Sequence, residues 1–306
     1  MTPTIELTRV SRWYGQVIAL NDVSLSIGPG VTGLLGPNGA GKSTFLRLAS
    51  GQIAPSQGEL RVLGLAPHRS PEVFYRLGLC PDVDATWDGL SAREFLVAVL
   101  GLTGFSPDEC RARAERALGE VDLVEAADRR VASYSQGMRQ RLKLAQAWAH
   151  DPEVLLLDEP LTGLDPLHRR RVIDLLRRWG ESGRTIVVSS HILWEVEAMT
   201  RRIVLIHKGR VLAEGDIHEI RDLLDEHPHS VALRSHDARA LAREIVAWPH
   251  VLSLAVGSEG EWLTVETARP DDFYAALPEL AIKMGVSEMY SPDDDLESVF
   301  RYLVNR

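Results

Sequence analysis

Short apolar runs alternate with helical patterns through the first half of the chain. Residues 4–10 and 18–27 predict two strands of an antiparallel sheet, with a tight turn between them. Residues 31–35 predict a compact buried strand, followed by a glycine-rich turn and a helix that begins near Lys42. This alternation is typical of an α/β domain with a largely parallel sheet.

Helical periodicity dominates the middle of the chain. Between about residues 70 and 149, apolar residues recur at spacings of three and four in residues 91–101, 107–119 and 137–149. Strand patterns then return at residues 154–157, 185–188 and 203–206. Pro166 suits the first turn of a helix, so a helix is expected between the first two of these strands.

A short polar stretch at residues 225–228 ends in a proline and predicts a domain boundary. The segments beyond it predict strand, helix, two strands, helix, strand and a last helix, at residues 230–234, 238–247, 251–256, 262–267, 271–280, 286–290 and 295–303. The first six have the β-α-β-β-α-β order of a ferredoxin-like fold. We therefore expect a first domain at residues 1–226 and a small α+β domain at residues 229–306.

Composition narrows the class of protein. Among 306 residues, 34 are basic and 43 acidic, a net charge of −9 that does not favour a nucleic-acid partner. Cys80 and Cys110 form no CxxC pair or Cys/His cluster, which argues against a disulfide scaffold or a zinc site. The chain opens without a secretory signal pattern, and its longest apolar stretch, residues 95–105, is too short for a membrane span. We expect a soluble protein of a reducing compartment.

A phosphate-binding pattern follows the strand at residues 31–35. Its sequence GPNGAGKST satisfies G-x-x-x-x-G-K-S/T, in which glycines let backbone N–H groups approach phosphates. Lys42 can reach the β- and γ-phosphates, and the Ser43 hydroxyl can ligate Mg²⁺. A chance glycine-rich turn is the alternative, but the strand–turn–helix context favours a nucleotide site. Its candidate residues are Gly36, Pro37, Asn38, Gly39, Ala40, Gly41, Lys42, Ser43 and Thr44.

Two adjacent carboxylates end a second apolar strand, in the sequence VLLLDEP at residues 154–160. Neighbouring side chains of a strand point to opposite faces, so the two can serve different tasks. Asp158 suits an outer-sphere Mg²⁺ partner, and Glu159 suits the base that orients an attacking water. The alternative, two solvated acids at a strand exit, is less favoured after a phosphate-binding loop.

With these motifs the chain resembles the ATPase subunits of ATP-binding-cassette (ABC) transporters over about residues 4–226. The sequence YSQGM at residues 134–138 occupies the place of the family signature, usually LSGGQ. Gly163, Leu164 and Asp165 resemble the D-loop, and His191 after Ser189 and Ser190 resembles the switch histidine. Tyr14 resembles the aromatic residue that stacks on adenine, and Asp82 stands at the Q-loop position. Taken alone, each has a plainer interpretation: Tyr14 as hairpin packing, Ser135 as a helix N-cap, and His191 as a surface residue.

The resemblance implies a P-loop ABC ATPase fold with a mixed sheet core, an antiparallel β subdomain and a helical subdomain at about residues 85–150. It implies that ATP and Mg²⁺ are bound and that Lys42, Glu159 and His191 act in hydrolysis. It also implies a head-to-tail dimer, expected to be a homodimer, in which Ser135, Gln136 and Gly137 face the γ-phosphate on the second subunit. ATP binding would close the dimer and hydrolysis would reopen it.

Departures from the common motifs point to one branch of the family. Gln136 and Met138 within YSQGM resemble the exporters of the ABC-2 type, as does the tail at residues 293–300, whose plainer interpretation is an amphipathic helix with an acidic first turn. Asp82 replaces a longer glutamine or glutamate, so a direct Mg²⁺ contact is not expected from it. A permease contact and a solvated acidic loop with Asp84 and Asp88 both remain open for Asp82.

Two functions follow from the resemblance. The first is an ATPase that drives a separate transmembrane permease for export, at the cytoplasmic face of the cell membrane. The second is a regulatory ABC ATPase that acts on a macromolecular complex. The chain has one cassette and lacks long coiled-coil or basic insertions, which favours transport. The basic run at residues 168–171 is interpreted as a solvated helix face, and co-purification with a membrane protein would separate the two functions.

Overall fold

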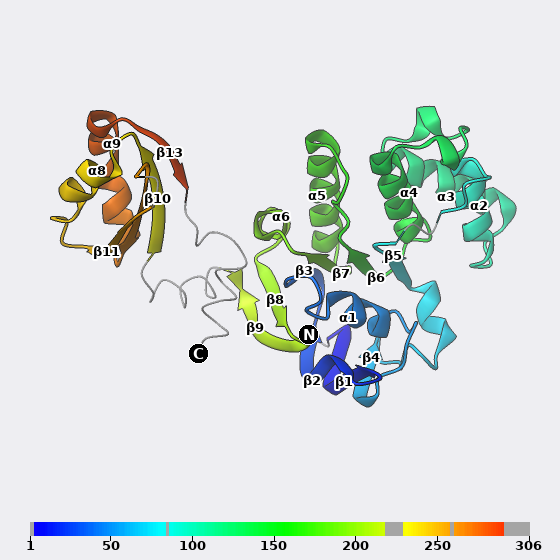
Figure 1. Cartoon of the computed structure of the whole chain (residues 1–306). Helices are drawn as coiled ribbons and strands as arrows, with labels where there is room; N and C mark the ends of the chain where they lie inside the picture. Colours follow the sequence, from blue (N-terminus) through cyan, green and yellow to red (C-terminus); the bar gives the residue numbers. More distant parts are fainter. Residues whose placement is uncertain (1–2, 84–85, 218–228, 258–259, 291–306) are drawn as a thin grey trace. The chain divides into compact units, whose positions relative to one another are not determined.

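The computed structural model describes residues 3–83, 86–217, 229–257 and 260–290 (Figure 1). The chain divides into two compact units, Met1–Asp216 and Ile217–Arg306. The predicted boundary at residues 225–228, the predicted helix at 295–303, the acidic tail at 293–300 and Asp84 lie outside the described residues. Among the helices of the described ranges, none combines the length and the apolar character that a membrane crossing requires.

A six-stranded sheet forms the centre of the first unit, in the order β5-β6-β7-β3-β8-β9. The first five strands are parallel and β9 is antiparallel to β8. The strands are β3 Gly30–Leu35, β5 Leu77–Cys80, β6 Val154–Asp158, β7 Thr185–Ser190, β8 Arg202–His207 and β9 Arg210–Asp216. The mixed sheet confirms the expected α/β class.

Two strands of this sheet were not expected from the sequence. β5 lies in the stretch that we expected to be mainly helical, and its four residues are too few to show a strand period. β9 is a half-buried edge strand whose polar residues mask any apolar alternation. Both strands form by pairing with a neighbour, β5 with β6 and β9 with β8. The local sequence does not show which segments will pair.

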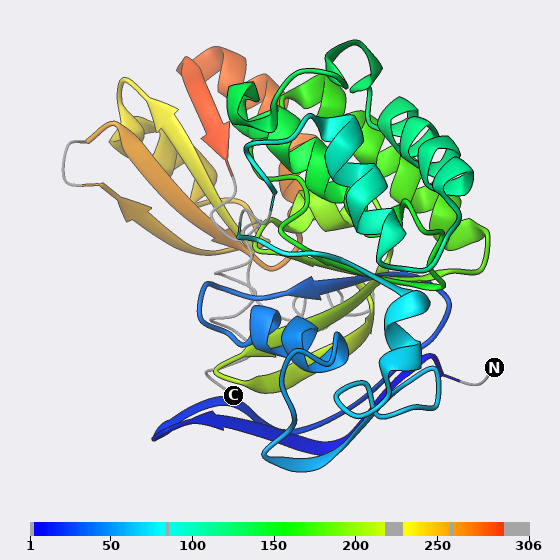
Figure 2. The ribbon, with the colours of Figure 1, turned by 90° about the vertical axis from the view of Figure 1, so that its right-hand side faces the viewer.

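A three-stranded antiparallel sheet, in the order β2-β1-β4, lies on one side of the central sheet, together with helix α1 (Figure 1, Figure 2). It comprises β1 Ile5–Tyr14, β2 Val17–Ile27 and β4 Gln57–Val62, the last of which was not predicted. Helix α1, Lys42–Ala49, buries Phe45 and Leu46 between this sheet and the central strands. The apolar layer between the two sheets fixes the helix that starts at Lys42.

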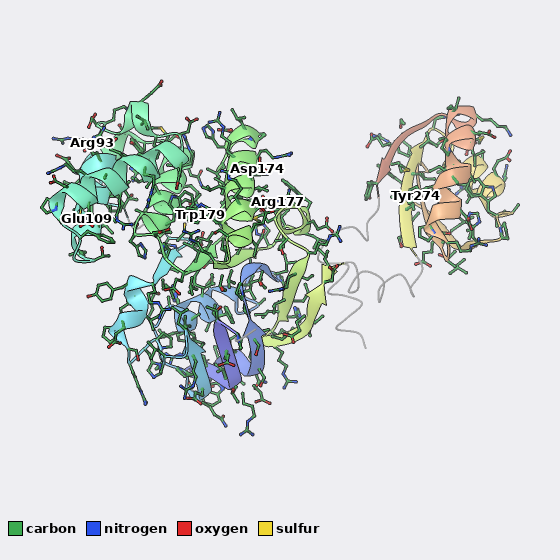
Figure 3. The ribbon with its side chains drawn as sticks, turned by 180° about the vertical axis from the view of Figure 1, so that it is seen from behind. Arg93, Glu109, Asp174, Arg177, Trp179 and Tyr274 are labelled. Atoms are coloured by element: carbon green, nitrogen blue, oxygen red, sulfur yellow. The ribbon has the colours of Figure 1, made fainter. Side chains whose placement is uncertain are left out.

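In the part of the first unit that the structure describes, five further helices cover the other side of the central sheet and its β5 edge: α2 Ala92–Gly101, α3 Pro107–Glu120, α4 Gln136–Trp148, α5 Pro166–Glu181 and α6 Leu193–Glu197. Short 3₁₀ turns lie at η1 Pro71–Tyr75, η2 Val124–Ala126 and η3 Val131–Ser133. Ser91 and Ser106 begin α2 and α3 with capping boxes. Trp179 of α5 packs edge-on against Trp148 of α4, with ring centroids 4.9 Å apart, so the helical subdomain is anchored on α5 (Figure 3).

Within residues 229–257 and 260–290, the second unit consists of a four-stranded antiparallel sheet, in the order β11-β12-β10-β13, and two helices. Its elements are β10 His229–Ser235, α8 Ala238–Ile245, β11 Val251–Val256, β12 Trp262–Thr267, α9 Pro270–Met284 and β13 Val286–Tyr290. Their order along the chain is the β-α-β-β-α-β order predicted from the sequence. Helix α9 runs past the predicted end at residue 280, through Pro278, and stops at Gly285 with a positive φ of 62°.

Candidate active site

The turn between β3 and α1 depends on glycines at specific positions. Gly39 and Gly41 have φ values of +79° and +115°, a region that other residues rarely adopt. A Cβ atom on Gly36 would lie 2.3 Å from the carbonyl oxygen of Ile206, and one on Gly41 would lie 2.7 Å from that of Ala19. At these two glycines the turn is therefore closely packed against β8 and β2 and has no room for a side chain.

Backbone amides gather where this turn enters α1. Within the described part of the chain, the N–H groups of Gly39, Gly41, Lys42, Ser43 and Thr44 donate no hydrogen bond. The Lys42 ammonium curls back over the turn and donates to the Gly36 carbonyl at 2.6 Å. Unpartnered amides at a helix N-terminus, with a buried ammonium beside them, form an anion-binding arrangement.

The two carboxylates at the end of β6 contact different partners, Ser189 for Asp158 and Lys42 with His191 for Glu159. Asp158 is only 7% exposed, and its Oδ1 accepts a hydrogen bond of 2.5 Å from Ser189 Oγ. The same hydroxyl accepts one of 3.0 Å from the Glu159 backbone N–H. Glu159 itself has a φ of +48°, an uncommon and strained conformation for a residue with a side chain. The backbone reversal directs the Glu159 carboxylate toward Lys42 and His191.

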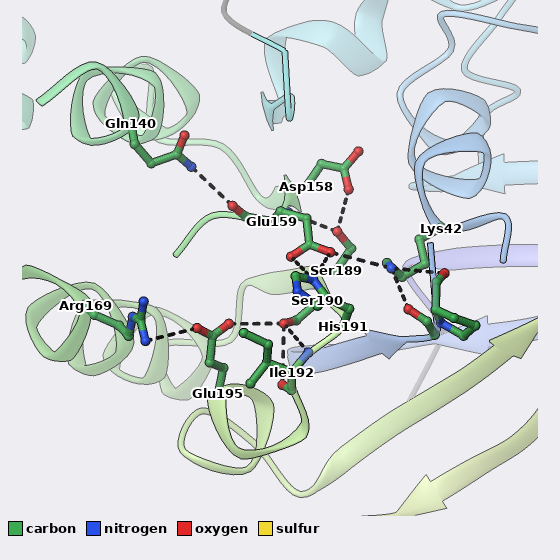
Figure 4. A network of polar contacts seen from close by, with 12 residues as sticks. Lys42, Gln140, Asp158, Glu159, Arg169, Ser189, Ser190, His191, Ile192 and Glu195 are labelled. Carbon is green, nitrogen blue, oxygen red and sulfur yellow. Dashed lines mark hydrogen bonds and ion pairs between the residues drawn. The ribbon is translucent and has the colours of Figure 1, made fainter. Parts of the chain in front are cut away.

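Glu159 is the centre of a cluster of charged and polar groups (Figure 4). The Lys42 Nζ atom lies 3.5 Å from its Oε1, and the His191 Nδ1 atom lies 3.1 Å from Oε1 and 3.0 Å from Oε2. These side chains follow β3, β6 and β7, which are neighbouring parallel strands. Because the carboxyl ends of parallel strands share one edge of a sheet, residues far apart in the chain meet there. The structure thus brings Lys42, Asp158, Glu159 and His191 together.

The remaining predicted residues lie on other elements. Tyr14 ends β1, is 40% exposed, and has the Arg12 guanidinium 4.9 Å from its ring centre. Asp82 is exposed, and its carbonyl oxygen accepts a hydrogen bond of 2.9 Å from Lys143 Nζ. Within the described part of the chain, neither residue is joined to Glu159 by a hydrogen bond or an ion pair. Tyr14 and Asp82 therefore stay predictions.

The signature and D-loop segments begin the helices α4 and α5. Ser135 caps α4, with its Oγ accepting from the Met138 N–H at 3.3 Å, and Asp165 caps α5 by accepting from the Leu167 and His168 N–H groups. These hydrogen bonds lower the pKa of Asp165, and those from His168 contribute most. A Cβ atom on Gly137 would lie 2.9 Å from the Gly163 carbonyl oxygen, so the two segments touch.

Several polar residues near the site were not singled out from the sequence. Gln140 is buried on α4 and donates to the Pro160 carbonyl at 2.9 Å, and Lys143, also buried on α4, donates to the carbonyls of Pro81 and Asp82. Both lie among the apolar positions of the helix, which is the signal that could have found them. The basic run at 168–171, which we interpreted as a solvated helix face, makes ion pairs: Arg169 pairs with buried Glu195, and Arg171 pairs with Asp122.

Two oxygen groups among the predicted site residues are suited to Mg²⁺. No group of three or more His, Cys, Asp or Glu side chains that could hold a metal is found in the described ranges. Mg²⁺ usually keeps several waters and uses one or two protein oxygens together with phosphates, so a full protein cage is not required. The Ser43 hydroxyl, next to the free amides, and the Asp158 carboxylate are oxygen donors of the kind that Mg²⁺ accepts.

Comparisons with known proteins agree with this geometry. A family model described as ABC transporter matches residues 20–162. The chain is 34% identical over 284 residues to the daunorubicin/doxorubicin resistance ATP-binding protein DrrA of Streptomyces peucetius, covering 92% of this chain and 86% of that protein. It is 39% identical over 213 residues to the Nod factor export ATP-binding protein I of Paraburkholderia xenovorans, covering 69% of this chain and 70% of that protein.

Solved structures give the same answer. The structure of an ATP-binding subunit of an ABC transporter superposes with a TM-score of 0.67 at 28% identity, covering 72% of this chain and 93% of that one. The dimeric structure of a bacterial ABC transporter cassette superposes with a TM-score of 0.65 at 26% identity, covering 70% of this chain and 98% of that one. The chain therefore belongs to the ATP-binding proteins of the ABC transporter family and is an ATPase of that family.

Proposed function

We propose that this ATPase drives a separate transmembrane permease that exports a substrate from the cell. Two relatives support the direction, since one is named for export and the other for drug resistance. The variant signature at residues 134–138 supports the same branch of the family. The observation that carries the chemistry is the cluster of Lys42, Glu159 and His191 at the edge of the sheet.

Each residue of the cluster has a role in this proposal. The amides at residues 39–44 and the Lys42 ammonium bind the β- and γ-phosphates. Glu159 orients the attacking water and accepts its proton. His191 lies against the same carboxylate and faces the γ-phosphate. Mg²⁺, held by Ser43 and Asp158, would neutralise charge on the phosphates. Tyr14 would stack on the adenine ring.

A second copy of the chain completes each ATP site in this proposal. Ser135, Gln136 and Gly137 lie at the N-terminus of α4, where Ser135 and Gln136 are exposed. A helix N-terminus attracts anions, so this segment is suited to the γ-phosphate bound on the other protomer. The structural relative that is itself dimeric supports the arrangement. Asp165, which begins α5 beside Gly163 and Gly137, would lie at the same dimer interface.

The two parts of the chain have different tasks in the proposal. Residues 1–226 form the ATP-binding domain, and residues 229–306 form an accessory domain without a phosphate-binding motif. The chain would lie on the cytoplasmic face of the membrane through its contact with the permease. Asp82, whose short side chain is exposed beside the helical subdomain, is proposed to contact the permease rather than Mg²⁺.

Dimer formation under blocked hydrolysis tests the central step. Glu159→Gln is expected to form a dimer in the presence of Mg-ATP, measured by size-exclusion chromatography with light scattering, and to be monomeric without nucleotide. Adding Ser135→Arg should prevent the dimer, because the larger cation replaces the exposed N-cap at the interface. A chain that stays monomeric with Mg-ATP, even when co-purified with its membrane partner, would refute the proposal.

The proposed contact with a permease needs a separate experiment. Capture of a polytopic membrane protein by the tagged chain tests it.

A further inference from the structure

A buried carboxylate lies behind the switch histidine and takes no part in the chemistry described above. Glu195 belongs to the short helix α6 and is only 4% exposed. Its Oε2 accepts a hydrogen bond of 3.1 Å from Ser190 Oγ, and its Oε1 lies 3.5 Å from Arg169 Nη1 (Figure 4). A buried charge is costly unless it is paired, so the site needs both partners.

The Ser190 contact fixes the backbone on both sides of His191. Ser190 Oγ accepts a hydrogen bond of 3.0 Å from the Ile192 N–H, two residues along the chain. A hydroxyl has one hydrogen, and the ionised Glu195 carboxylate can only accept it. The Ile192 carbonyl oxygen lies 3.4 Å from the same Oγ, farther than the Glu195 carboxylate at 3.1 Å. The nearer, charged acceptor therefore orients the hydroxyl, whose lone pairs remain available to the Ile192 N–H. Ser189 faces Asp158 and Ser190 faces Glu195, because neighbouring strand residues point to opposite sides.

The Arg169 contact leads to the segment that precedes Asp165. Arg169 lies on the first turn of α5, and its Nη2 donates to the Leu164 carbonyl at 3.5 Å. Its guanidinium carbon lies 5.4 Å from the centre of the Trp194 ring, and its Nε is buried without a partner among the described residues. The ion pair with Glu195 is thus the charged contact that holds Arg169 between the segment after β7 and the segment that precedes α5.

We propose that Glu195 is a positioning residue for ATP hydrolysis. It orients Ser190 and so holds His191 against Glu159, and through Arg169 it links this loop to the Leu164–Asp165 segment. The inference rests on the proposed function, since it takes Glu159 and His191 as residues of the hydrolytic site. Burial raises the pKa of Glu195, opposed by the hydrogen bond from Ser190 and the charge of Arg169.

Steady-state kinetics of the full chain with Mg-ATP test this role. Glu195→Gln and Ser190→Ala should each lower kcat by about ten-fold or more, since small displacements of positioned groups are costly, while KM changes by less than about two-fold. The double variant should lose less kcat than the product of the two single losses, because both substitutions affect the Ser190–Glu195 contact, while Glu195→Gln also removes the charge that pairs with Arg169. Glu181→Gln, an exposed position on α5, is the matched control and should keep the parental kcat.

A second variant separates positioning from packing. Glu195→Met fills similar space without an acceptor, and we expect it to lose at least as much kcat as Glu195→Gln while keeping the parental circular dichroism spectrum. If both variants keep kcat within two-fold of the parent while Glu159→Gln abolishes hydrolysis, the role of Glu195 is refuted and the proposed function stands. If Glu159→Gln itself hydrolyses ATP at the parental rate, the hydrolytic assignment fails, and the inference fails with it.

Discussion

The Nδ1 atom of His191 lies 3.0 Å from Oε2 of Glu159, although 32 positions separate them along the chain. The contact follows from sheet register: β6 and β7 are parallel and pair Asp158 with Ser189, so the residues just beyond them leave the sheet at the same edge. The left-handed φ of Glu159 then turns its carboxylate toward the histidine. A strained backbone and a paired register together place the carboxylate beside Lys42.

Glu159→Gln should bind ATP with nearly the parental affinity and hydrolyse it at least about 10²-fold more slowly. The substitution keeps size and polarity but removes the base, and general bases contribute about 10²–10⁴-fold to rates. Phosphate release under single-turnover conditions, with affinity from a fluorescent ATP analogue, measures both. Glu125→Gln, an exposed position in the helical subdomain, is the control. Parental turnover by the Glu159 variant would show that another group activates the water.

Lys42→Ala should weaken ATP binding by about ten-fold to a hundred-fold. The ammonium is buried over the glycine-rich turn, and a charge-assisted hydrogen bond is worth about 1.5–3 kcal/mol. Isothermal titration calorimetry with ATP measures the change directly. Arg47→Ala removes an exposed cation from the same helix and should leave the affinity unchanged. Equal affinities of the Lys42 variant and the parent would count against phosphate binding by this lysine.

Gly137→Ala should lower stability although it lies in a helix, where alanine is usually better by about 1 kcal/mol. The new methyl group would meet the Gly163 carbonyl oxygen at 2.9 Å, and backbone atoms there cannot yield cheaply. Gly119→Ala in α3 meets nothing within 4 Å and should stabilise the protein instead. Urea unfolding of both variants compares the two signs. Stabilisation by both substitutions would mean that the signature and D-loop segments do not pack closely.

Much of the fold could be predicted from local sequence patterns. The strand before Gly36 and the strand before Asp158 are apolar runs with a turn or charge at the end, and both form as predicted. The order of elements in the second unit could be predicted because its helices and strands have distinct periods and short polar connections. The phosphate-binding turn follows a spacing rule that is itself a consequence of backbone geometry.

Other features depend on contacts between distant residues and could not be predicted. Glu159 has a positive φ and donates its N–H to Ser189 Oγ on the neighbouring strand, and its residue type does not predict that conformation. Glu195 looks like any acid of an amphipathic helix until Arg169 and Ser190 are placed around it. Strand β5 exists because β6 pairs with it. In each case a tertiary partner decides the local structure.

The stability contribution of Cys80 should depend on pH. Burial raises the pKa of this thiol from near 9.0 to about 12, so above pH 9 the unfolded chain loses a proton that the folded chain keeps. The folded state then binds more protons, and stability falls as pH rises. Between pH 8 and 10 the parent should lose about 1 kcal/mol of unfolding free energy relative to Cys80→Ala. Urea unfolding at both pH values checks this, and a constant difference would contradict it.

Lys143→Met should destabilise the fold by about 1–3 kcal/mol, because it removes part-buried, charge-assisted hydrogen bonds from the ammonium to carbonyl oxygens. The Lys143 ammonium is buried on α4 and donates to the carbonyl oxygens of Pro81 at 3.0 Å and Asp82 at 2.9 Å, so it ties the Q-loop position to the helix that Ser135 caps. Methionine keeps the bulk and removes only the donor and the charge. Urea unfolding gives the loss, with Arg47→Met, an exposed cation on α1, as the control that should change stability by less than about 0.5 kcal/mol. A Lys143 variant as stable as the parent would mean that these hydrogen bonds merely offset the cost of burying the ammonium, and that the Q-loop backbone is held by other contacts.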